Sequence, residues 1–273
     1  MRSRDASGGN ARNMKIDLLN KLAVITGASG ELGRAMARTL AGCGADVVLH
    51  YHQNRSKAEE LRCELTAMGV RSMAVQADVT DPASIMTMRD AIVAQLGHAH
   101  IIVNNAVVIY EHKSILEQPL EDYDGQYRSC VLQNVAMAKA FVPGMIANNY
   151  GRVIATSTIE AMQNPDFSSA YVSGKRGMDG VLRVLAREVG EHQITVNQIA
   201  PGWTNSERVR TTVEHGNPAY EQSLARYAER VPMKRMGTDQ EVANVVAFLA
   251  SDLASYVTGV FIPVAGGLIM PAI

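Results

Sequence analysis

The stretch "LAVITGASGELG", residues 22–33, joins an apolar run directly to a glycine-rich turn. Residues 22–26 predict a buried strand, and the apolar helical pattern over 31–43 predicts the helix that follows it. The glycines of the turn recur at every third position, at Gly27, Gly30 and Gly33. Glycine allows a tight turn and a close approach of the backbone, so amide donors and the helix N-terminus can hold a pyrophosphate. A strand, turn and helix in this order predict a dinucleotide site, with a purely structural turn as the alternative.

The rest of the chain repeats this alternation of short apolar runs and longer helical patterns. Further strands are predicted at 46–51, 71–79, 99–105, 151–157, 193–200 and 259–267. Further helices are predicted at 55–68, 82–96, 123–147, 168–189 and 239–251, with Pro143 near a bend or end. Continuous apolar strands alternating with helices are typical of stacked βαβ units. We therefore expect an α/β fold over residues 15–273: a single Rossmann-type doubly wound domain with a seven-stranded parallel sheet and helices on both faces.

Two segments depart from this alternation. Residues 1–14 are polar and rich in Gly and Ser, which predicts a mobile N-terminal tail. Residues 203–236 are charged, contain no predicted strand, and follow the sixth strand at the edge of the sheet where open α/β folds bind ligands. This position favours a lid over a substrate, with an exposed insertion as the alternative. The arginines of this segment would suit an anionic substrate, although such charges are commonly just solvated.

Composition narrows the class of protein. The net charge of -1 supplies no basic field for nucleic acid. Three unevenly spaced cysteines, Cys43, Cys63 and Cys130, indicate neither a disulfide framework nor a metal site, and favour a reducing compartment. No apolar run approaches about 18 residues, so no membrane span is predicted. We expect a soluble cytoplasmic protein whose partner is a small molecule.

The end of the second predicted strand bears on the choice of cofactor. NAD enzymes usually place an acid there to bind the ribose 2′-hydroxyl. Here the sequence reads "HYHQNR", residues 50–55, which has no acid and ends in Arg55. Because Arg55 could pair with a 2′-phosphate, NADP(H) is favoured over NAD(H). The alternative role of Arg55 is to cap and solvate the next helix.

Tyr171 and Lys175 are a candidate acid/base pair. Residues four apart lie on one face of a helix, so the ammonium of Lys175 can lie near the phenol of Tyr171. A nearby cation stabilises the phenolate and lowers the pKa of a tyrosine from its ordinary value of roughly 10. Proton exchange with an alcohol or a carbonyl oxygen then becomes feasible near neutral pH.

Together with "NNA" (104–106), "YVSGK" (171–175), "NQIAPG" (197–202) and "VTGVFIPVAGG" (257–267), these features resemble the short-chain dehydrogenase/reductase family. The resemblance is strongest to its single-domain, 3-oxoacyl-carrier-protein reductase-like branch, and it runs from about Lys15 to Gly267 with the motifs in the family's order.

This resemblance implies roles for individual residues. Tyr171 would be the general acid/base, Lys175 its partner, and Thr158 the hydroxyl that orients the substrate carbonyl. Asp78 and Val79 would contact the adenine, Pro201 and Gly202 would lie beside the nicotinamide, and Thr204 near its carboxamide. The full set of cofactor-binding residues implied is Gly27, Ser29, Gly30, Leu32, Gly33, Arg55, Asp78, Val79, Asn105, Ala106, Tyr171, Lys175, Pro201, Gly202 and Thr204. The resemblance also implies a homotetramer or homodimer.

Several positions depart from the family pattern. Glu31 replaces a glycine of the turn and brings a carboxylate close to the expected phosphates. Val107 replaces the last glycine of N-N-A-G, and Thr158 stands where the family usually has serine. Cys130 aligns with the family's asparagine, which helps to hold a relay water, and Asn134 lies one helical turn further on.

One further charged residue lies close to the predicted site. Glu160, two positions after Thr158, could project toward the substrate or could be a solvated loop charge.

Three functional hypotheses follow. The first is an NADPH-dependent ketone reductase, or an alcohol dehydrogenase running the reverse, with a Tyr–Lys acid/base mechanism. The second keeps the fold but changes the reaction to an imine, enone or dehydration step, and the departures motivate it. The third is a cofactor-binding protein with little turnover.

Overall fold

Seven parallel strands form one sheet in the order β3-β2-β1-β4-β5-β6-β7. The computed structural model describes residues 15–205 and 218–270. The strands are β1 (Leu22–Ile25), β2 (Asp46–Tyr51), β3 (Ser72–Gln76), β4 (Ile101–Asn104), β5 (Gly151–Thr156), β6 (Ile194–Pro201) and β7 (Phe261–Val264). Val24 pairs with Val48 of β2 on one side and with Ile102 of β4 on the other, so the strand order reverses around β1. The α/β Rossmann-type fold predicted from the sequence is confirmed.

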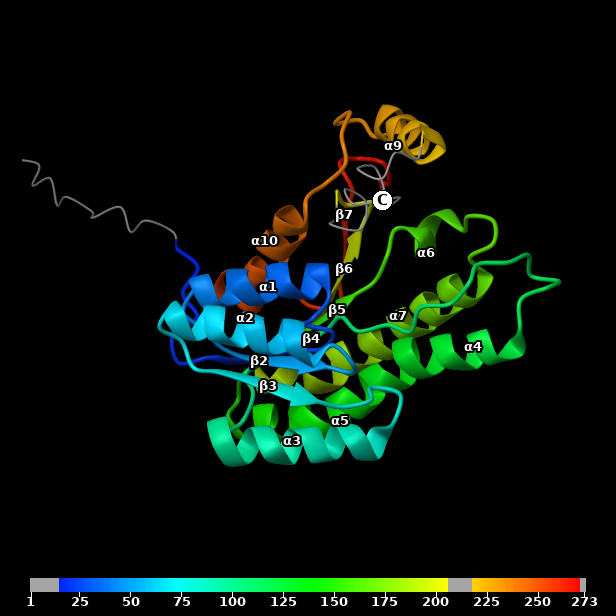
Figure 1. Ribbon diagram of the computed structural model, residues 1–273. Coiled ribbons are helices and arrows are strands. Elements are labelled where there is room, and N and C mark those ends of the chain that lie inside the picture. The colour runs from blue at the N-terminus through cyan, green and yellow to red at the C-terminus, as the bar shows by residue number, and fades with distance from the viewer. Residues whose placement is uncertain (1–14, 206–217, 271–273) are drawn as a thin grey trace, which may run out of the picture.

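Helices cover both faces of this sheet (Figure 1). One face carries α1 (Glu31–Gly42), α2 (Arg55–Ala67) and α10 (Asp239–Ala250). The other carries α3 (Pro82–Leu96), α4 (Leu120–Gln126), α5 (Gln133–Ala147) and α7 (Ser169–Val189). Two more helices, α6 (Glu160–Gln163) and α9 (Pro218–Arg230), follow β5 and β6 and lie toward one end of the sheet.

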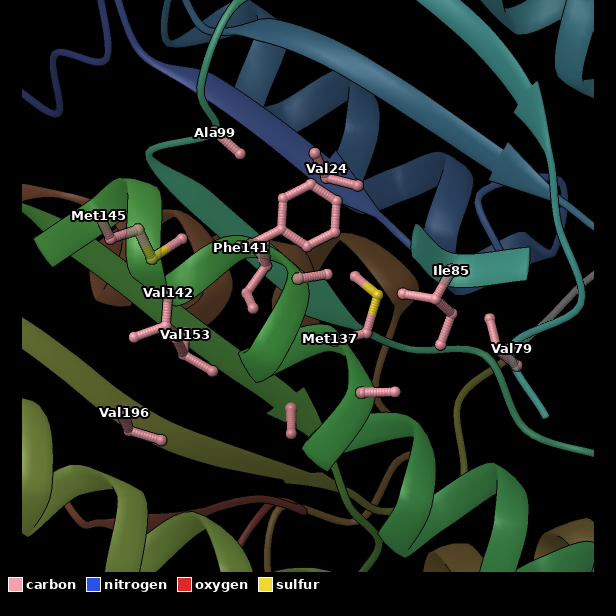
Figure 2. Packing of buried hydrophobic residues seen from close by; sticks show 14 of the residues in the cluster. Val24, Val79, Ile85, Ala99, Met137, Phe141, Val142, Met145, Val153 and Val196 are labelled. Atoms are coloured by element: carbon pink, nitrogen blue, oxygen red, sulfur yellow. The ribbon is translucent and has the colours of Figure 1, made fainter. Parts of the chain in front are cut away.

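The apolar strands supply the core on both faces. In Figure 2, Phe141 of α5 points toward Val24 of β1, and Met137 points toward Ile85 of α3. All of these side chains are at most 4% exposed. Burying a side chain of this size stabilises a fold by roughly 1.5–3 kcal/mol, so this layer fixes α5 firmly against the sheet.

The long helix predicted over 123–147 is interrupted. A π-helical segment, Tyr127–Leu132, separates α4 from α5, and Cys130 lies within it. Such segments are rare and commonly occur at functional sites, because the wider turn redirects side chains and carbonyls. Pro143, expected near a bend or end, lies inside α5, which continues to Ala147. Cys43, at the end of α1, is half-buried and packs against the core.

Helix α4, the π-helical segment and α5 follow one another without a gap. By length and apolar composition, this combined stretch, Leu120–Ala147, could cross a membrane. Within this fold, however, its most apolar part is 56% buried, and its side chains contribute to the core. This pattern is that of a core helix.

The strand reversal around β1 places a ligand crevice at the carboxyl ends of β1 and β4. The predicted N-terminal tail, residues 1–14, lies outside the described residues, as does 206–217 of the predicted lid. The described part of that lid contains α9, a helix that the sequence did not predict.

Candidate active site

The glycine-rich turn between β1 and α1 is built for backbone approach. Gly27 has a φ of +66°, in the left-handed region that side chains disfavour. A Cβ on Gly33 would lie 2.4 Å from the carbonyl oxygen of Gly27, so no side chain fits there. Helix α1 begins at Glu31 with Gly30 as its N-cap, and this cap makes no side-chain hydrogen bond. The N-terminus of a helix at this position is favourable for an anionic group.

His50 of β2 supports this turn from below. The backbone N–H of Gly27 donates to His50 Nδ1 at 3.0 Å, and His50 Nε2 lies 3.0 Å from the carbonyl oxygen of Ala77. Since Nδ1 accepts, the proton of the neutral ring belongs on Nε2, which donates to Ala77. Burial disfavours the imidazolium and lowers the pKa of His50 to about 4. Sequence reasoning missed this role, although a histidine within an apolar strand was a visible signal.

A cleft of about 640 Å³ opens beside the turn. Of the predicted cofactor residues, it is lined by Gly27, Ser29, Gly30, Asp78, Val79, Asn105 and Ala106. Its wall at the end of β2 consists of His50, His52, Gln53 and Asn54. Leu32 and Gly33 lie in α1, and exposed Arg55 begins α2; none of the three is among the lining residues.

Asp78 keeps a charged carboxylate in this cleft. Its Oδ1 accepts hydrogen bonds from the backbone N–H and the hydroxyl of Thr80, at 2.8 and 2.7 Å. Burial by itself would raise the pKa of Asp78, but these hydrogen bonds and the nearby histidines outweigh it and lower the pKa.

Thr26 joins the turn to the neighbouring strand. Its hydroxyl oxygen accepts from the backbone N–H groups of Asn105 and Ala106, at 2.9 and 3.0 Å. The same hydroxyl donates to Gln133 Oε1 of α5 at 3.1 Å. The floor of the cleft is therefore fixed by one side chain that bonds to two other segments.

These residues fit a dinucleotide. The turn leaves no room for side chains where a pyrophosphate would approach, and α1 begins directly after it, so the N-terminal end of the helix dipole faces the same place. Val107 lines the same cleft, so the departure from glycine adds bulk there and leaves the cleft open. Among the residues that the structure describes, no group of three or more His, Cys, Asp or Glu side chains could hold a metal ion.

Tyr171 and Lys175 project from the first turns of α7. Lys175 Nζ donates to the carbonyl oxygen of Thr156 at 2.6 Å and lies 5.7 Å from the centre of the Tyr171 ring. Lys175 is 3% exposed, and burial lowers its pKa. Burial also raises the pKa of Tyr171, with further contributions from Cys130 and Glu160, while a hydrogen bond with the Thr158 hydroxyl acts in the opposite direction. Lys175 is not among the groups that shift the pKa of Tyr171, so the lowering expected from the sequence is not seen, and burial keeps the phenol protonated.

Neighbouring groups hold this pair in place. The backbone N–H of Tyr171 donates to the hydroxyl of Tyr110, in the loop after β4, at 2.9 Å. Thr158 is buried, and its hydroxyl oxygen accepts from the backbone N–H of Glu160 at 3.2 Å. Tyr110 was missed from the sequence, because no local pattern connects it with a helix that starts sixty residues later.

Asn134 rather than Cys130 supplies an amide near the expected relay position. Its Nδ2 donates to the carbonyl oxygen of Cys130 at 2.6 Å, and its Oδ1 accepts from Asn104 Nδ2 at 2.7 Å. The Cys130 thiol contacts Gln126 Oε1 at 3.8 Å. The carbonyl that the family resemblance assigns to a relay water is thus already bonded to a side chain one turn further on.

The residues that follow β6 lie at the same carboxyl edge of the sheet. Gly202 donates its N–H to the carbonyl oxygen of Val264 at 3.0 Å, directly after Pro201. The backbone N–H of Trp203 donates to the hydroxyl of Tyr227 on α9 at 2.9 Å, and the two rings stack 4.8 Å apart. Thr204 forms an isolated bridge with Gly237. Pro201, Gly202 and Thr204 do not line the 640 Å³ cleft. They lie at and just after the carboxyl end of β6, on the same side of β1 as β4 and β5 in the sheet.

Comparison with known proteins gives consistent matches over nearly the whole chain. A family model described as enoyl-(acyl carrier protein) reductase matches residues 27–269. The 3-oxoacyl-[acyl-carrier-protein] reductase of Staphylococcus epidermidis is 34% identical over 253 residues, which is 92% of this chain and 100% of the relative. The Escherichia coli reductase of the same name is 33% identical over 251 residues, covering 92% and 98% of the two chains.

Solved structures agree. L-sorbose reductase from Gluconobacter frateurii, complexed with NADPH and L-sorbose, is similar with a TM-score of 0.88 at 30% identity, covering 95% of this chain and 100% of that chain. A 7α-hydroxysteroid dehydrogenase, complexed with NADH and 7-oxo glycochenodeoxycholic acid, has a TM-score of 0.84 at 29% identity, covering 93% and 96%.

Proposed function

The chain belongs to the short-chain dehydrogenase/reductase family, and from this premise we propose that it is an NADPH-dependent reductase of a ketone, or the alcohol dehydrogenase of the reverse reaction. It is an oxidoreductase that acts on CH–OH and C=O groups of a small molecule. The observation that carries the proposal is the half-buried Tyr171 phenol, which is hydrogen-bonded to the Thr158 hydroxyl and whose ring centre lies 5.7 Å from Nζ of the buried Lys175 side chain.

A bound nicotinamide supplies the hydride for such a reaction. The chain's own residues then control the carbonyl oxygen. The Thr158 hydroxyl orients that oxygen by a hydrogen bond, and Tyr171 donates its proton to it. Tyr171 is protonated at neutral pH and can donate, but its raised pKa makes it a weak acid, so the transfer requires groups that stabilise the phenolate. Lys175, at 5.7 Å from the ring centre, stabilises the phenolate that remains after the proton has left.

We further propose a preference for NADPH. Its support is the wall of the cleft at the end of β2, where His52, Gln53 and Asn54 offer no carboxylate to a ribose 2′-hydroxyl. Arg55 follows at the start of α2, so its guanidinium and the helix N-terminus both favour a 2′-phosphate. Fluorescence titration with NADPH and with NADH measures the preference directly, and tighter binding of NADH would contradict it.

Replacing Tyr171 by Phe tests the reaction. We expect Tyr171→Phe to lower kcat for a panel of ketones by about 10²- to 10⁴-fold, because general acid catalysis is lost. NADPH affinity, measured by fluorescence, should stay close to that of the wild type. Tyr256→Phe is the matched control, since the Tyr256 side chain is fully exposed. Equal turnover by the wild type and Tyr171→Phe would show that another group is the acid.

The same experiment separates a second candidate. The bond from Asn134 to the Cys130 carbonyl alters the expected relay, which favours a modified reaction such as an imine, enone or dehydration step. Tight NADPH binding without reduction of any ketone, followed by turnover of an imine or enone, would favour it. Binding with no turnover of any such substrate would indicate a cofactor-binding protein. The homotetramer or homodimer and the cytoplasmic location stay predictions from the sequence.

A further inference from the structure

Glu160 carries a buried, unpaired carboxylate oxygen close to Thr158 and Tyr171. Its Oε2 atom is buried, yet it has no hydrogen-bond partner among residues 15–205 and 218–270. Buried carboxylate oxygens are normally paired, because removing a charge from water without compensation is costly. Such an atom next to a reaction site is therefore a candidate for binding a substrate group.

The backbone fixes where this carboxylate starts. Glu160 begins α6, and its N–H donates to the hydroxyl oxygen of Thr158. The next residue, Ala161, accepts a hydrogen bond from Arg176 Nε of α7 at 2.7 Å, which ties α6 to the helix that carries Tyr171. The carboxylate is thus held two residues from the hydroxyl that orients the carbonyl.

The charge of Glu160 affects phenols on three elements. Burial is the main reason that the pKa values of Tyr110, Tyr171 and Tyr227 are raised, and the negative charge of Glu160 raises all three further. These phenols come from the loop after β4, from α7 and from α9. The charge of Glu160 therefore acts on the Tyr171 phenol and on Tyr227, whose ring stacks on Trp203.

An unpaired carboxylate oxygen beside Thr158 and Tyr171 matches one substrate chemistry best. Ammonium groups are attracted both by the negative charge and by the faces of Trp and Tyr rings. Building on the proposed function, we propose that Glu160 determines substrate specificity and that it selects ketones carrying a protonated amine. The amine N–H would donate to Oε2 while the carbonyl accepts from Thr158 and Tyr171. No step of the reaction changes, because Glu160 acts by positioning the substrate.

Three methyl ketones of equal chain length test this assignment: one ends in a dialkylammonium group, one in a hydroxyl group and one in a carboxylate. We expect the wild type to reduce the ammonium ketone with the highest kcat/KM. Glu160→Gln should lower that value by about tenfold or more, mainly through KM, because a hydrogen bond to a charged group contributes roughly 1.5–3 kcal/mol. The variant should leave the hydroxyl ketone within about threefold and improve the carboxylate ketone.

Glu191→Gln is the matched control. It removes the same charge from a side chain that is 81% exposed and belongs to the turn after α7. Its kcat/KM values should equal those of the wild type for all three ketones. A uniform loss across the three ketones in Glu160→Gln would overturn the proposal, since it would indicate a purely structural residue. So would a wild-type preference for the carboxylate ketone, or for the hydroxyl ketone, which would point to an anionic or a polyol substrate instead.

A binding measurement keeps this proposal separate from the proposed function. The ammonium compound with an amide in place of its ketone cannot be reduced, and calorimetry measures its affinity for the protein saturated with NADP⁺. We expect about tenfold weaker binding by Glu160→Gln than by wild type. If no ketone is reduced but this difference persists, the proposed reaction is wrong and the role of Glu160 stands. Equal affinities would refute the role of Glu160 whatever the reaction is.

Discussion

The two ligand regions of this molecule differ in how their polar groups are used. Around the glycine-rich turn, the described side chains bond to the protein itself: His50 to Gly27 and Ala77, and Thr26 to Asn105, Ala106 and Gln133. Around the end of β5, three buried polar atoms have no partner in the described part of the chain: Thr156 Oγ1, Ser157 Oγ and Glu160 Oε2. Asn104 Oδ1, at the end of β4 between the two regions, is a further such atom.

The two regions therefore have different roles. The region around the glycine-rich turn is a preorganised scaffold, and the region around the end of β5 selects among ligands. A region whose supporting side chains are already bonded to the protein is preorganised, and it offers a ligand its backbone. A region with unpaired polar atoms carries a desolvation cost, which a complementary ligand removes. We interpret the first region as the site of a constant ligand, and the second as the site that distinguishes one substrate from another.

The largest effect should come from breaking the scaffold at Gly33. Since a Cβ there would meet the Gly27 oxygen at 2.4 Å and Ala28 Cα at 2.8 Å, Gly33→Ala must displace the turn. We expect NADPH affinity to fall by about 100-fold or more, and the free energy of unfolding to fall by roughly 1–3 kcal/mol. Fluorescence titration and chemical denaturation measure the two quantities.

Gly180→Ala is the control for that change. Gly180 lies inside α7, where an added Cβ meets nothing within 4 Å. Alanine in a helix interior is favoured over glycine by roughly 0.5–1 kcal/mol, so this variant should be slightly more stable and bind NADPH normally. A Gly33→Ala protein that bound NADPH as well as Gly180→Ala does would contradict the role given to the turn.

A smaller effect, on the free energy of unfolding, should appear when His50 becomes protonated at low pH. Its folded pKa of about 4 is below its ordinary value of 6.5, so folding favours the neutral ring. The stabilisation is complete above pH 6.5 and is lost as the pH falls toward 4, because the unfolded chain then binds a proton that the folded chain rejects. Between about pH 7 and pH 5, His50 should remove about 2 kcal/mol from the free energy of unfolding.

His50→Asn separates this titration from other groups. Asparagine can offer Gly27 an acceptor oxygen but does not titrate. We expect its stability to depend less steeply on pH in this range than that of the wild type, as followed by denaturation at both pH values. Curves of equal slope would show that His50 is not the titrating group.

The smallest effect should come from the substrate region at Tyr227. Tyr227→Phe keeps the ring that stacks on Trp203 but removes the hydroxyl that accepts a hydrogen bond from the backbone N–H of Trp203. We expect a loss of about 1 kcal/mol in holding α9, seen as a several-fold rise in KM for the ketone at unchanged NADPH affinity. An equal loss of NADPH affinity would mean that the two regions are not separate in the way described above.

The features that could be predicted from the sequence depend on residues close together in the chain. The strand, turn and helix around Gly27 depend on neighbouring residues, and the spacing of Tyr171 and Lys175 is a property of one helix. Both features were therefore visible without a structure. Strand ends were less accurate: the third strand spans Ser72–Gln76 rather than 71–79, because the chain turns away where Asp78 bonds to Thr80.

Contacts between distant segments were not predictable. His50 meets Gly27, Tyr110 meets Tyr171, and Tyr227 meets Trp203 across long separations in sequence. The π-helical segment and the short helix α6 also depend on tertiary packing, since propensity and periodicity are nearly the same for π and α turns. The sequence predicts which residues carry the chemistry of the site, whereas tertiary contacts decide the pKa of the predicted acid, Tyr171.

The three-way bond at Thr26 has an evolutionary consequence. One hydroxyl accepts from two backbone amides of the β4 loop and donates to Gln133, so each partner depends on the same atom. A valine at position 26 would have nearly the same shape as threonine. It would leave the N–H groups of Asn105 and Ala106 and the side-chain amide oxygen of Gln133 without their hydrogen-bond partner. Positions 26 and 133 can therefore drift only as a pair, and descendants of this protein that lose one should be found to have replaced the other.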